Sequence, residues 1–545
     1  MRPPAADRGR RKFGGRGAKS VSGVAAAFLC SSSEPPATVY DQLQYMLLKL
    51  ALRGQAGVSV AAFMHKEGIR YAKTVDLSCG SVRIGHVEQN LKFRPHVAIA
   101  QIHSRGGTGD VRPICTTESA SRNFAISLDG AVINSSELRG ELLAEGYRLG
   151  GSTDAELLLN WLEVSCEREH WRNNLPVSYE KLFRDIDDRI DGAISVLLLD
   201  REGNLVAYRN RSGLRPLEFM QTDDGFLLFA SENCAFIGLE GKAQQLLPGH
   251  IKYVDGKTGG CTDRSVGIGR YKAKLCAYEA LYLGNPNTSI EGQSHRETRY
   301  NIGGALGGLV AQRLQGAPDS TPTIVSSMPH TGGPYADGLF ASLAEHGVLV
   351  RRQEVVATQF LQRTLIGTPS ERKSRIAQKY LVQQNSLAES TIVMVDEALI
   401  RGDTSQAVTN MLLAAGAKAV HWAIGSPPIV APNYYGMGID TLEELAFWRI
   451  WKRLPPEQRK QSLRFHKMEA QVLKIIECDI AAFINAATIT YLPFQLLEAM
   501  LPCGHDGFDL SPFTFEMPTP AGQKRADRNL HELTADLSSS QSIPA

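Results

Sequence analysis

The sequence predicts two domains of different architecture, a sheet-rich layered α+β domain followed by an α/β domain with a parallel sheet. The chain has 545 residues, of which 43% are hydrophobic and 21% are charged, so it is long enough for two separate cores. Short apolar runs of strand type dominate as far as about Val254, whereas long helical patterns alternate with strand runs after residue 275. Such alternation is typical of a parallel sheet with helices on both faces.

Strands of the first domain are predicted where a short apolar run lies between turn residues. These runs span residues 24–29, 58–64, 96–102, 124–133, 194–200, 205–209 and 226–231. Two stretches, 38–54 and 135–147, repeat apolar residues at helical spacing and are predicted as helices. Because strands outnumber helices, the pattern favours a layered arrangement of sheets and helices.

In the second domain, strands are predicted at residues 322–328, 348–356, 391–396 and 419–425. Residues 404–420 are expected to form a crossover: a helix begins at Thr404 and Ser405 and closes at Gly416, and the next strand follows. Residues 441–500 continue as mostly helix. The last 25 or so residues are polar and are expected to be disordered.

The charge balance bears on the class of partner. The chain has 59 basic and 57 acidic residues, and its formal charge of +2 gives no chain-wide attraction to nucleic acid or to a membrane surface. A nucleic-acid role would need a local basic patch. The sequence contains no run of about 18 apolar residues, so no membrane span is expected.

Cysteine usage and the N-terminus bear on the compartment. Nine cysteines, an odd number without a CxxC pair, favour buried thiols in a reducing, cytoplasmic setting. Residues 1–20 are rich in Arg, Lys and Gly but lack the apolar core of a secretory signal. They are expected to form a disordered basic extension, with targeting to an organelle as the alternative.

The segment TIVMVDEALIRGDTS at residues 391–405 indicates the chemistry of the second domain. Ligands of open parallel sheets bind beyond the carboxyl ends of the strands, and Asp396 and Glu397 stand at such an end. Two neighbouring carboxylates can accept hydrogen bonds from vicinal hydroxyls, as on a ribose, and can help to hold a divalent cation. The turn at Gly402 leads into a helix N-terminus, which offers amide groups to a phosphate. Together these features indicate a phosphorylated sugar.

This run of a strand, two acids, three apolar residues and RGxTS resembles the signature of type I phosphoribosyltransferases. Their acids grip the ribose of 5-phosphoribosyl-1-pyrophosphate (PRPP), and their loop cradles its 5′-phosphate. Further segments occur in the order found in the amidophosphoribosyltransferase family, among them SPPIVAPNYYGMGIDTLEEL (426–445), LDGAVINSSELRGELLAEGY (128–147) and STDAELLL (152–159). The resemblance covers about residues 21–515.

The resemblance implies two named domains. Residues 21–270 would form an α+β N-terminal nucleophile hydrolase-like (αββα) glutaminase domain, similar to glutamine amidotransferases of type 2. Residues 271–500 would form the α/β type I phosphoribosyltransferase domain with C-terminal helices. Residues 1–20 would be the basic extension and residues 501–545 a largely disordered tail. The family makes phosphoribosylamine, in the first step of purine biosynthesis, from PRPP and ammonia that an N-terminal cysteine releases from glutamine.

The reactive centre of the glutaminase half departs from the family pattern. Ser22 stands at the position of the nucleophilic cysteine, and a hydroxyl is harder to ionise than a thiol. It would also need cleavage after Val21 to act as an N-terminal nucleophile. Cys30 is a nearby thiol that either substitutes for the nucleophile or belongs to the core. Asp129 and Gly130 fall in the segment of the oxyanion site, where a carboxylate opposes developing negative charge.

The residues implied to bind glutamine are partly kept. Arg53 of the RGQ element and Asp154 of the STDAE element match the family at these positions. The arginine that holds the glutamine carboxylate in the family falls in a segment that reads AQIHSRGGTG here, where His103 or Arg105 could compensate. Glutaminase activity is therefore expected to be impaired.

The phosphoribosyl half is better preserved. The resemblance implies PRPP-binding roles for Asp396, Glu397, Arg401, Gly402, Thr404, Ser405, Thr331, Gly332, Arg363 and Lys379. Mg²⁺ would be held together with PRPP through Asp396 and Glu397. Asp403 departs from the pattern, because an anion beside a phosphate is unfavourable unless it turns outward. His330 replaces an acid in the pyrophosphate-facing loop and either meets pyrophosphate or fills space.

Some members of the family carry a four-cysteine iron–sulfur cluster. Cys276 matches one ligand position, but the other positions correspond to Asn433, Asp509 and Pro512. A cubane cluster takes four thiolates, so no iron–sulfur cluster is expected.

Three functions remain open at the level of sequence. The first is PRPP binding with ammonia-dependent transfer to the ribose, and the alternative is a catalytically inactive paralogue that acts as a structural or regulatory partner. A serine-dependent hydrolase, formed by N-terminal processing, is the third. The expected partners are PRPP, glutamine or ammonia, and either a second copy of the chain in a homo-oligomer or an active paralogue in a hetero-assembly. Neither nucleic acid nor a membrane is expected as a partner.

Overall fold

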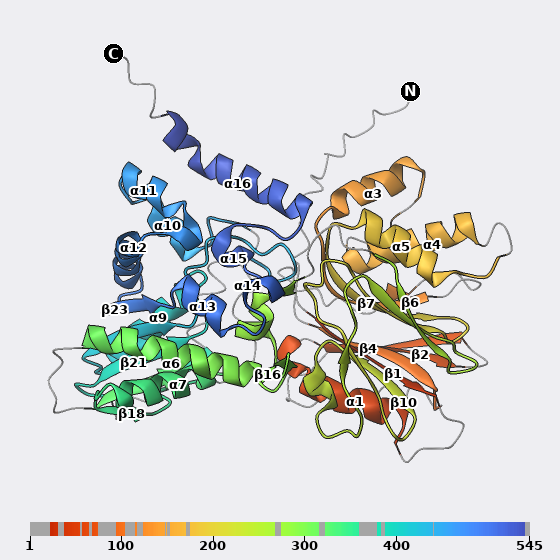
Figure 1. Cartoon of the computed structure of the whole chain (residues 1–545), viewed down its shortest axis with the longest axis horizontal. Coiled ribbons are helices and arrows are strands. Elements are labelled where there is room, and N and C mark those ends of the chain that lie inside the picture. The colour runs from red at the N-terminus through yellow and green to blue at the C-terminus, as the bar shows by residue number, and fades with distance from the viewer. Residues whose placement is uncertain are drawn as a thin grey trace, which may run out of the picture.

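The computed structural model shows two bodies that lie side by side (Figure 1). The structure describes residues 22–30, 37–54, 57–64, 68–74, 94–103, 115–116, 124–147, 149, 153–170, 175–267, 274–314, 322–358, 379–382, 387–439 and 441–539. The first body contains two antiparallel sheets, and the second contains a parallel sheet. The fold class predicted from the sequence is confirmed.

Seven strands form one sheet of the first body. Their order is β11 (Gln244–Gln245), β9 (Glu218–Gln221), β10 (Phe226–Ala230), β1 (Gly23–Leu29), β4 (Val97–His103), β2 (Gly57–Met64) and β3 (Gly68–Thr74). Neighbouring strands run antiparallel throughout.

A second sheet of six strands packs against the first. Its order is β13 (Cys261–Ser265), β12 (His250–Val254), β8 (Leu205–Arg209), β7 (Gly192–Asp200), β6 (Phe124–Val132) and β5 (Cys115–Thr116). Val24, Ala26 and Phe28 of β1 join Leu197 and Leu199 of β7 in the apolar core between the two sheets. The central strands are apolar on both faces because each sheet is covered on both sides.

Helices cover the outer faces and complete four layers. They are α1 (Val39–Lys49), α3 (Ser135–Ala144), α4 (Asp154–Glu169) and α5 (Tyr179–Arg189), with short 3-10 turns at Ala51–Arg53 and Asn233–Phe236. α1 packs on the seven-stranded sheet, and α3, α4 and α5 pack on the other sheet. Capping boxes at Thr38 and Thr153 start α1 and α4, since each side chain accepts a hydrogen bond from the backbone three residues later.

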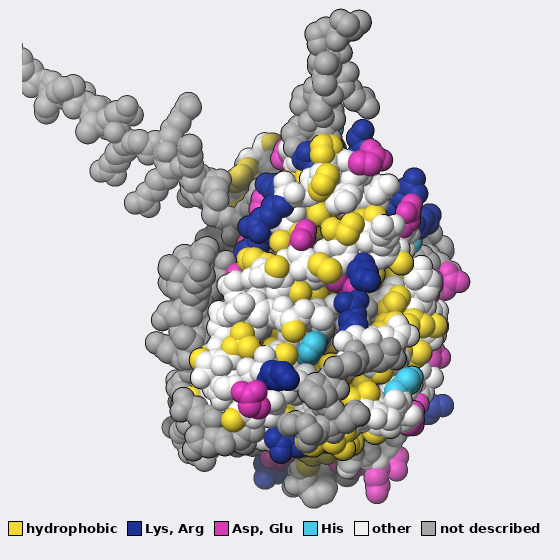
Figure 2. All heavy atoms as spheres, turned by 90° about the vertical axis from the view of Figure 1, so that its left-hand side faces the viewer, with side chains coloured by type: hydrophobic (Ala, Val, Ile, Leu, Met, Phe, Trp, Pro, Cys, Tyr) yellow, Lys and Arg dark blue, Asp and Glu magenta, His cyan; other side chains and the backbone are white. Residues whose placement is uncertain are grey.

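The second body is centred on five parallel strands in the order β18 (Val350–Arg352), β17 (Thr323–Ser327), β21 (Thr391–Asp396), β22 (Ala419–Ile424) and β23 (Thr488–Tyr491). Its larger helices are α6 (His295–Leu314), α7 (Gly333–Glu345), α9 (Asp403–Ala414), α10 (Ala446–Trp451), α11 (Pro456–Ser462), α12 (Ala470–Phe483) and α13 (Phe494–Met500). Figure 2 faces the outer side of this body, where charged side chains are interspersed with hydrophobic ones.

One sequence-based boundary in the second body was wrong, and another was confirmed. The run 348–356 is not one strand: β18 joins the parallel sheet, whereas β19 (Val356–Thr358) pairs antiparallel with β20 (Tyr380–Val382) in a separate ribbon. The break falls at polar residues 353 and 354, where Glu354 turns to accept hydrogen bonds from Ser327. The crossover helix ends at Ala414, and Gly416 follows with a φ of +96°.

Short elements join the two bodies. β14 (Leu275–Cys276) pairs in parallel with β24 (Phe508–Asp509), and a π-helix follows at Glu279–Leu283. The ribbon β15 (Ser289–Ile290) and β16 (Gln293–Ser294) precedes α6. α14 (Gly504–Gly507) and α15 (Ser511–Thr514) flank β24.

The expected disordered tail is instead largely helical. α16 (Pro520–Ser539) lies across the top of the molecule between the two bodies (Figure 1). Leu530 and Leu533 pack against the core of the second body, and the Arg525 guanidinium lies 4.2 Å from the centre of the Tyr434 ring. The Ala521 amide donates to Asp191 of the first body at 2.8 Å. These contacts order a segment that composition alone marks as polar.

Within the described ranges, no helix combines the length and the apolar character that crossing a bilayer requires.

Candidate functional site

The candidate PRPP site lies at the carboxyl edge of the parallel sheet. β17 and β21 are neighbours in register, with Ser327 opposite Val395, so both strands end at the same edge. The loop after β17 contains Thr331 and Gly332, and the loop after β21 contains Glu397 and Gly402. The parallel topology therefore brings together two loops that lie about 70 residues apart in sequence.

Asp396 and Glu397 form an acidic pair at this edge. Asp396 is half-buried, and Glu397 is 7% exposed. Glu397 accepts a hydrogen bond from Thr331 Oγ1 at 2.8 Å, and its own amide donates to Asp396 Oδ1 at 3.1 Å. No cation of the described chain lies within ion-pairing distance of either carboxylate. The pair is therefore held in place without a protein counter-ion.

The electrostatics of the acidic pair favour an external cation or hydroxyl donors. Burial, and next the charge of Glu397, raise the pKa of Asp396 well above its usual value, while the more distant charge of Lys379 opposes the shift. The repulsion between two carboxylates that are largely shielded from water is relieved by a ligand that supplies positive charge or hydrogen-bond donors. Their oxygen chemistry fits Mg²⁺ together with a sugar diol.

The loop after β17 presents a strained backbone. His330 has a φ of +84°, a left-handed conformation that non-glycine residues rarely adopt. A Cβ on Gly332 would lie 2.7 Å from the Met328 carbonyl oxygen, so only glycine fits there. Because Gly332 caps α7 and the first helix hydrogen bond runs from the Ala336 amide to the Gly332 carbonyl, the Gly333 amide has no acceptor within the helix.

The surroundings of His330 disfavour the charged form of its imidazole. Burial, and then the charge of Lys379, lower the pKa of its imidazole. Its Nε2 lies 3.4 Å from the Thr358 hydroxyl, on β19. Of the two roles open from the sequence, a neutral imidazole that packs beside the loop is favoured over a charged partner of pyrophosphate.

The loop after β21 forms a second helix N-terminus. Gly402 has a φ of +83°, and a Cβ there would lie 2.7 Å from Cε1 of Phe483. The first hydrogen bond of α9 runs from the Gln406 amide to the Gly402 carbonyl at 2.9 Å, so the amides of residues 403–405 have no acceptor within the helix. Thr404 is half-buried and Ser405 is 3% exposed. This end of α9 can bind a phosphate.

Two charged residues of this loop are occupied by protein partners. Arg401 is buried and pairs with Glu444, which argues against its predicted role in binding PRPP. Asp403 Oδ1 accepts from Arg449 Nη1 at 3.1 Å, and the same nitrogen donates to the Arg401 carbonyl at 3.2 Å. The anion that seemed unfavourable is thus neutralised from α10. No motif in the sequence marks Arg449 as its partner.

Two cations from the segment before β20, Lys379 and Arg363, were also predicted to bind PRPP. Lys379 precedes β20, and its charge acts on both Asp396 and His330, which places it near the acidic pair. Arg363 lies outside the described residues.

The predicted glutaminase centre contains a buried ion-pair network. The Arg53 side chain is 0% exposed and donates five hydrogen bonds. Its acceptors are the Ser22 carbonyl at 3.0 Å, Glu232 at 3.0 Å, Asp129 at 2.7 Å, and both oxygens of Glu279 at 2.8 and 3.2 Å. All five guanidinium N–H groups are used, which argues against the glutamine-binding role predicted for Arg53.

Asp129 lies between two arginines at the centre of this network. Its carboxylate accepts from Arg53 and, at 3.2 Å, from Arg215. Burial alone would raise its pKa, but Arg215 and Arg53 hold the pKa of Asp129 below its usual value. A Cβ on Gly130 would lie 1.9 Å from the Ala193 carbonyl oxygen, so this glycine is needed for strand packing. The position that the resemblance assigns to the oxyanion site is thus held by a carboxylate paired with two arginines.

Ser22 is held at both backbone groups. Its amide donates to Asp129 Oδ1 at 3.1 Å, and its carbonyl accepts from Arg53. Cys30 lies beyond the opposite end of β1, a strand of seven residues that spans about 20 Å. It is too far from Ser22 to replace it, and burial raises the pKa of its thiol. The substitute role considered for Cys30 is therefore wrong.

The remaining glutamine-binding positions are engaged in the fold. Asp154 begins α4, and its Oδ2 accepts from the Val132 amide at 3.0 Å. His103 is fully buried, with Nε2 2.9 Å from the Ser59 hydroxyl. Arg105 lies outside the described residues.

The positions that match iron–sulfur ligands come together as a polar cluster. Cys276 pairs with Asp509 across β14 and β24, and Asn433 Nδ2 donates to Cys276 Sγ at 3.7 Å. Burial raises the pKa of Asp509 to about 6 and that of Cys276 further above its usual value. No group of three or more His, Cys, Asp or Glu in the described part of the chain is arranged to hold a metal ion.

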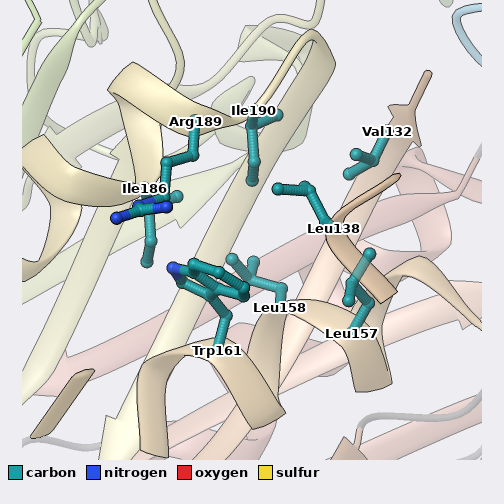
Figure 3. Close-up of a pocket in the computed structure, with 8 residues that line it drawn as sticks. All are labelled: Val132, Leu138, Leu157, Leu158, Trp161, Ile186, Arg189 and Ile190. Carbon is teal, nitrogen blue, oxygen red and sulfur yellow. The ribbon is translucent and has the colours of Figure 1, made fainter. Parts of the chain in front are cut away.

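One further cavity lies away from both centres. It lies between α3, α4 and α5 and the end of β6 (Figure 3). Its lining consists of Val132, Leu138, Leu157, Leu158, Trp161, Ile186, Arg189 and Ile190. The Arg189 guanidinium stacks over Trp161 at 5.0 Å, and the other walls are apolar. The cavity lacks the convergent polar groups of a ligand site.

Comparisons with known proteins agree with this architecture. A model of a glutamine amidotransferase domain matches residues 101–238. The amidophosphoribosyltransferase of Methanocaldococcus jannaschii is 28% identical over 434 residues, which are 75% of this chain and 85% of the relative. Amidophosphoribosyltransferase 1, chloroplastic, of Arabidopsis thaliana is 27% identical over 411 residues, 74% of this chain and 63% of the relative.

Solved structures share the fold over nearly the whole chain. A glutamine PRPP amidotransferase from B. subtilis, complexed with ADP and GMP, superimposes with a TM-score of 0.69 at 22% identity and covers 92% of this chain and 98% of its own. A structure described as the allosteric regulatory enzyme of purine biosynthesis gives the same score and coverage at 21% identity. The two bodies therefore define a class II glutamine amidotransferase domain joined to a phosphoribosyltransferase domain. The chain resembles amidophosphoribosyltransferases, with 28% identity over 434 residues to one relative and 26% over 414 residues to another.

Proposed function

We propose that this chain binds PRPP with Mg²⁺ at the acidic pair and transfers the phosphoribosyl group to free ammonia, without hydrolysing glutamine. The observation that carries the proposal is the acidic pair, Asp396 and Glu397, which has no protein counter-ion and stands between two helix N-termini. When bound, Mg²⁺ would supply positive charge to the pyrophosphate and the ribose hydroxyls, and Asp396 and Glu397 would hold it with PRPP.

Each loop has a separate task in this proposal. The carboxylates of Asp396 and Glu397 accept hydrogen bonds from the ribose hydroxyls, and the amides of residues 403–405 bind the 5′-phosphate. The N-terminus of α7 and Lys379 face the pyrophosphate. Ammonia forms a bond to C1 as the bond from C1 to the pyrophosphate oxygen breaks. Pyrophosphate leaves with the electron pair, and the new ammonium group releases a proton to solvent.

The proposal of impaired glutaminase activity rests on the environment of Ser22. Were Val21 removed, the backbone nitrogen of Ser22 would become a free α-amino group. This nitrogen lies 3.1 Å from Oδ1 of the Asp129 carboxylate. An amine in contact with a buried carboxylate stays protonated and cannot act as a base. The paired carboxylate at the oxyanion position also opposes a tetrahedral anion. Both effects act against hydrolysis of glutamine.

A second candidate is a catalytically inactive paralogue that acts as a structural or regulatory partner. It is favoured by the ion-pair network, in which Glu279 of the second body binds Arg53 and Arg215 of the first. This arrangement ties the domains together at the place where the family works on glutamine. In this role the rigidly joined domains would serve assembly, as a homo-oligomer or with an active paralogue.

Pyrophosphate release separates these candidates. The full chain is incubated with PRPP and Mg²⁺, and with either ammonium at about pH 8.5 or glutamine. We expect release with ammonium and none above background with glutamine, and we expect Asp396→Asn to abolish the ammonium-dependent release. Equal release with glutamine would overturn the impaired-glutaminase proposal. No release with either donor, despite PRPP binding, would leave the inactive paralogue as the function.

A further inference from the structure

Six exposed cations lie on the segment that follows the phosphate loop. They are Lys452, Arg453, Lys460, Arg464, Lys467 and Lys474, called the basic surface below. They come from the end of α10, from α11, from the 3-10 turn at Phe465–Lys467 and from the first turns of α12. Figure 2 faces these helices and shows Lys and Arg side chains spread over the upper half of the face, with fewer acidic ones between them.

The basic surface is poorly neutralised by the protein. Glu457 and Glu469 are the acids between residues 452 and 474, and Glu469 pairs with Arg464 at 3.7 Å. Among the described residues, the other five cations of the basic surface have no carboxylate within ion-pairing distance. Arg449, just upstream, is not part of the surface because Asp403 neutralises it.

The chain-wide charge balance hides this concentration. Residues 452–474 carry seven basic and two acidic side chains, a surplus of five positive charges. Residues 1–20, which lie outside the described ranges, carry a surplus of six. Since the whole chain has a charge of +2, the remaining residues together carry −9. Positive charge is thus gathered in two short segments of an otherwise acidic protein.

We propose that the basic surface binds the phosphate backbone of a single-stranded nucleic acid. The six cations come from four successive elements rather than from one loop, so one small anion cannot contact them all. A chain of phosphates can, and it gains affinity from the counterions released on binding. This replaces the expectation of no nucleic-acid partner, which rested on the net charge of the whole chain.

Local chemistry favours a single strand over a membrane. No large hydrophobic side chain between residues 452 and 474 is exposed, so the surface lacks the apolar residues that insert into lipid. Phe465 and His466 lie half-buried between Arg464 and Lys467. Their rings pack against Phe515 and Phe494, and their exposed edges remain open to unpaired bases.

Fluorescence anisotropy with a labelled 20-nucleotide oligouridine tests the proposal on the full chain. The test variant is Lys452→Gln/Lys460→Gln/Lys467→Gln, which removes three unpaired cations. We expect at least tenfold weaker binding at about 0.1 M salt, and a slope of log affinity against log salt that is smaller by about 2, since each lost contact to a single strand contributes about 0.7.

A matched control removes three exposed cations elsewhere, as Lys242→Gln/Lys257→Gln/Lys418→Gln, and is expected to bind like the wild type. Equal binding by the test variant and the wild type overturns the proposal, as does an equal loss in the control. Loss only on removal of residues 1–20 would assign binding to that segment instead. Tighter binding to vesicles rich in phosphatidylserine than to the RNA would assign the surface to a membrane. Far-UV circular dichroism confirms that each variant is folded.

Discussion

Asp403 stands at the first position of α9, where its charge would repel the phosphate that this helix end is proposed to bind. Arg449, which lies 46 residues further along the chain, neutralises this charge. Its Nη1 donates to Asp403 Oδ1 at 3.1 Å. The same arginine donates to the Arg401 carbonyl and so braces the loop. One unfavourable residue is thereby offset by a partner that the loop sequence alone does not reveal.

Arg449→Gln is expected to weaken PRPP binding. It exposes the Asp403 charge, which at about 8 Å from the phosphate and an effective dielectric constant of about 20 costs roughly 2 kcal/mol, or about thirtyfold in affinity. Asp403→Asn in the Arg449→Gln background removes the stray charge and is expected to restore most of the affinity. Calorimetric titration of the single and double variants measures both effects. Equal affinities for wild type and Arg449→Gln would show that Asp403 does not face the phosphate.

Asp396→Asn is expected to stabilise the unliganded protein. Because the folded-state pKa of Asp396 is raised above the ordinary value of 3.8, the folded chain holds a proton that the unfolded chain releases. Stability therefore falls as the pH rises through the folded pKa, and the uncharged variant escapes this loss. Thermal unfolding should show a higher midpoint than wild type at about pH 8 and no difference at about pH 3.5. A lower midpoint for Asp396→Asn than for the wild type at pH 8 would contradict the claim that the acidic pair destabilises the unliganded protein.

At the scale of elements, the sheet edge explains why these loops meet. β21 was predicted at its observed bounds, because its apolar run lies between turn residues and is buried on both faces. The helix that follows was also predictable from Gly402 and Gly416. The split between β18 and β19 was not, since it depends on hydrogen bonds from Ser327 to Glu354. α16 was not predicted because Arg525 and two leucines, Leu530 and Leu533, rather than a continuous apolar face, hold it against the second body.

Gly402→Ala is expected to disturb the phosphate loop. The left-handed backbone and the 2.7 Å approach to Phe483 together should cost about 1–3 kcal/mol of stability and reduce PRPP affinity. Gly140→Ala is a matched control, because this glycine lies in α3 with open space around it. That control should gain up to about 1 kcal/mol. Urea denaturation measures the free energy of unfolding of both variants. Equal changes in this free energy would show that the backbone at Gly402 does not require glycine.

At the scale of the molecule, the two bodies are joined through charge. Arg53 and Arg215 of the first body face Asp129, Glu232 and the interdomain Glu279, all nearly inaccessible to water. From the sequence, Arg53 was predicted to bind glutamine and Asp129 to fall in the segment of the oxyanion site. The sequence could not pair them with Glu279, because that contact spans 226 residues and crosses between domains.

Arg53→Met and Glu279→Gln should differ sharply in stability. The methionine leaves three buried carboxylates with one arginine, which is expected to cost about 3–5 kcal/mol. The glutamine keeps most hydrogen bonds and leaves two arginines facing two carboxylates, so its cost should be near 1 kcal/mol. Denaturant unfolding followed by near-UV circular dichroism measures the difference. Similar losses for both variants would refute a charge-balanced network.

Calorimetric titration of PRPP with Mg²⁺ into the full chain tests the central claim most directly, that adjacent acids at the edge of the parallel sheet hold the ribose. We predict saturable binding to the wild type, with one site per chain, and no measurable heat for Asp396→Asn/Glu397→Gln when that variant is shown to be folded. An absence of binding to the wild type, or equal affinity in the variant, would contradict the claim.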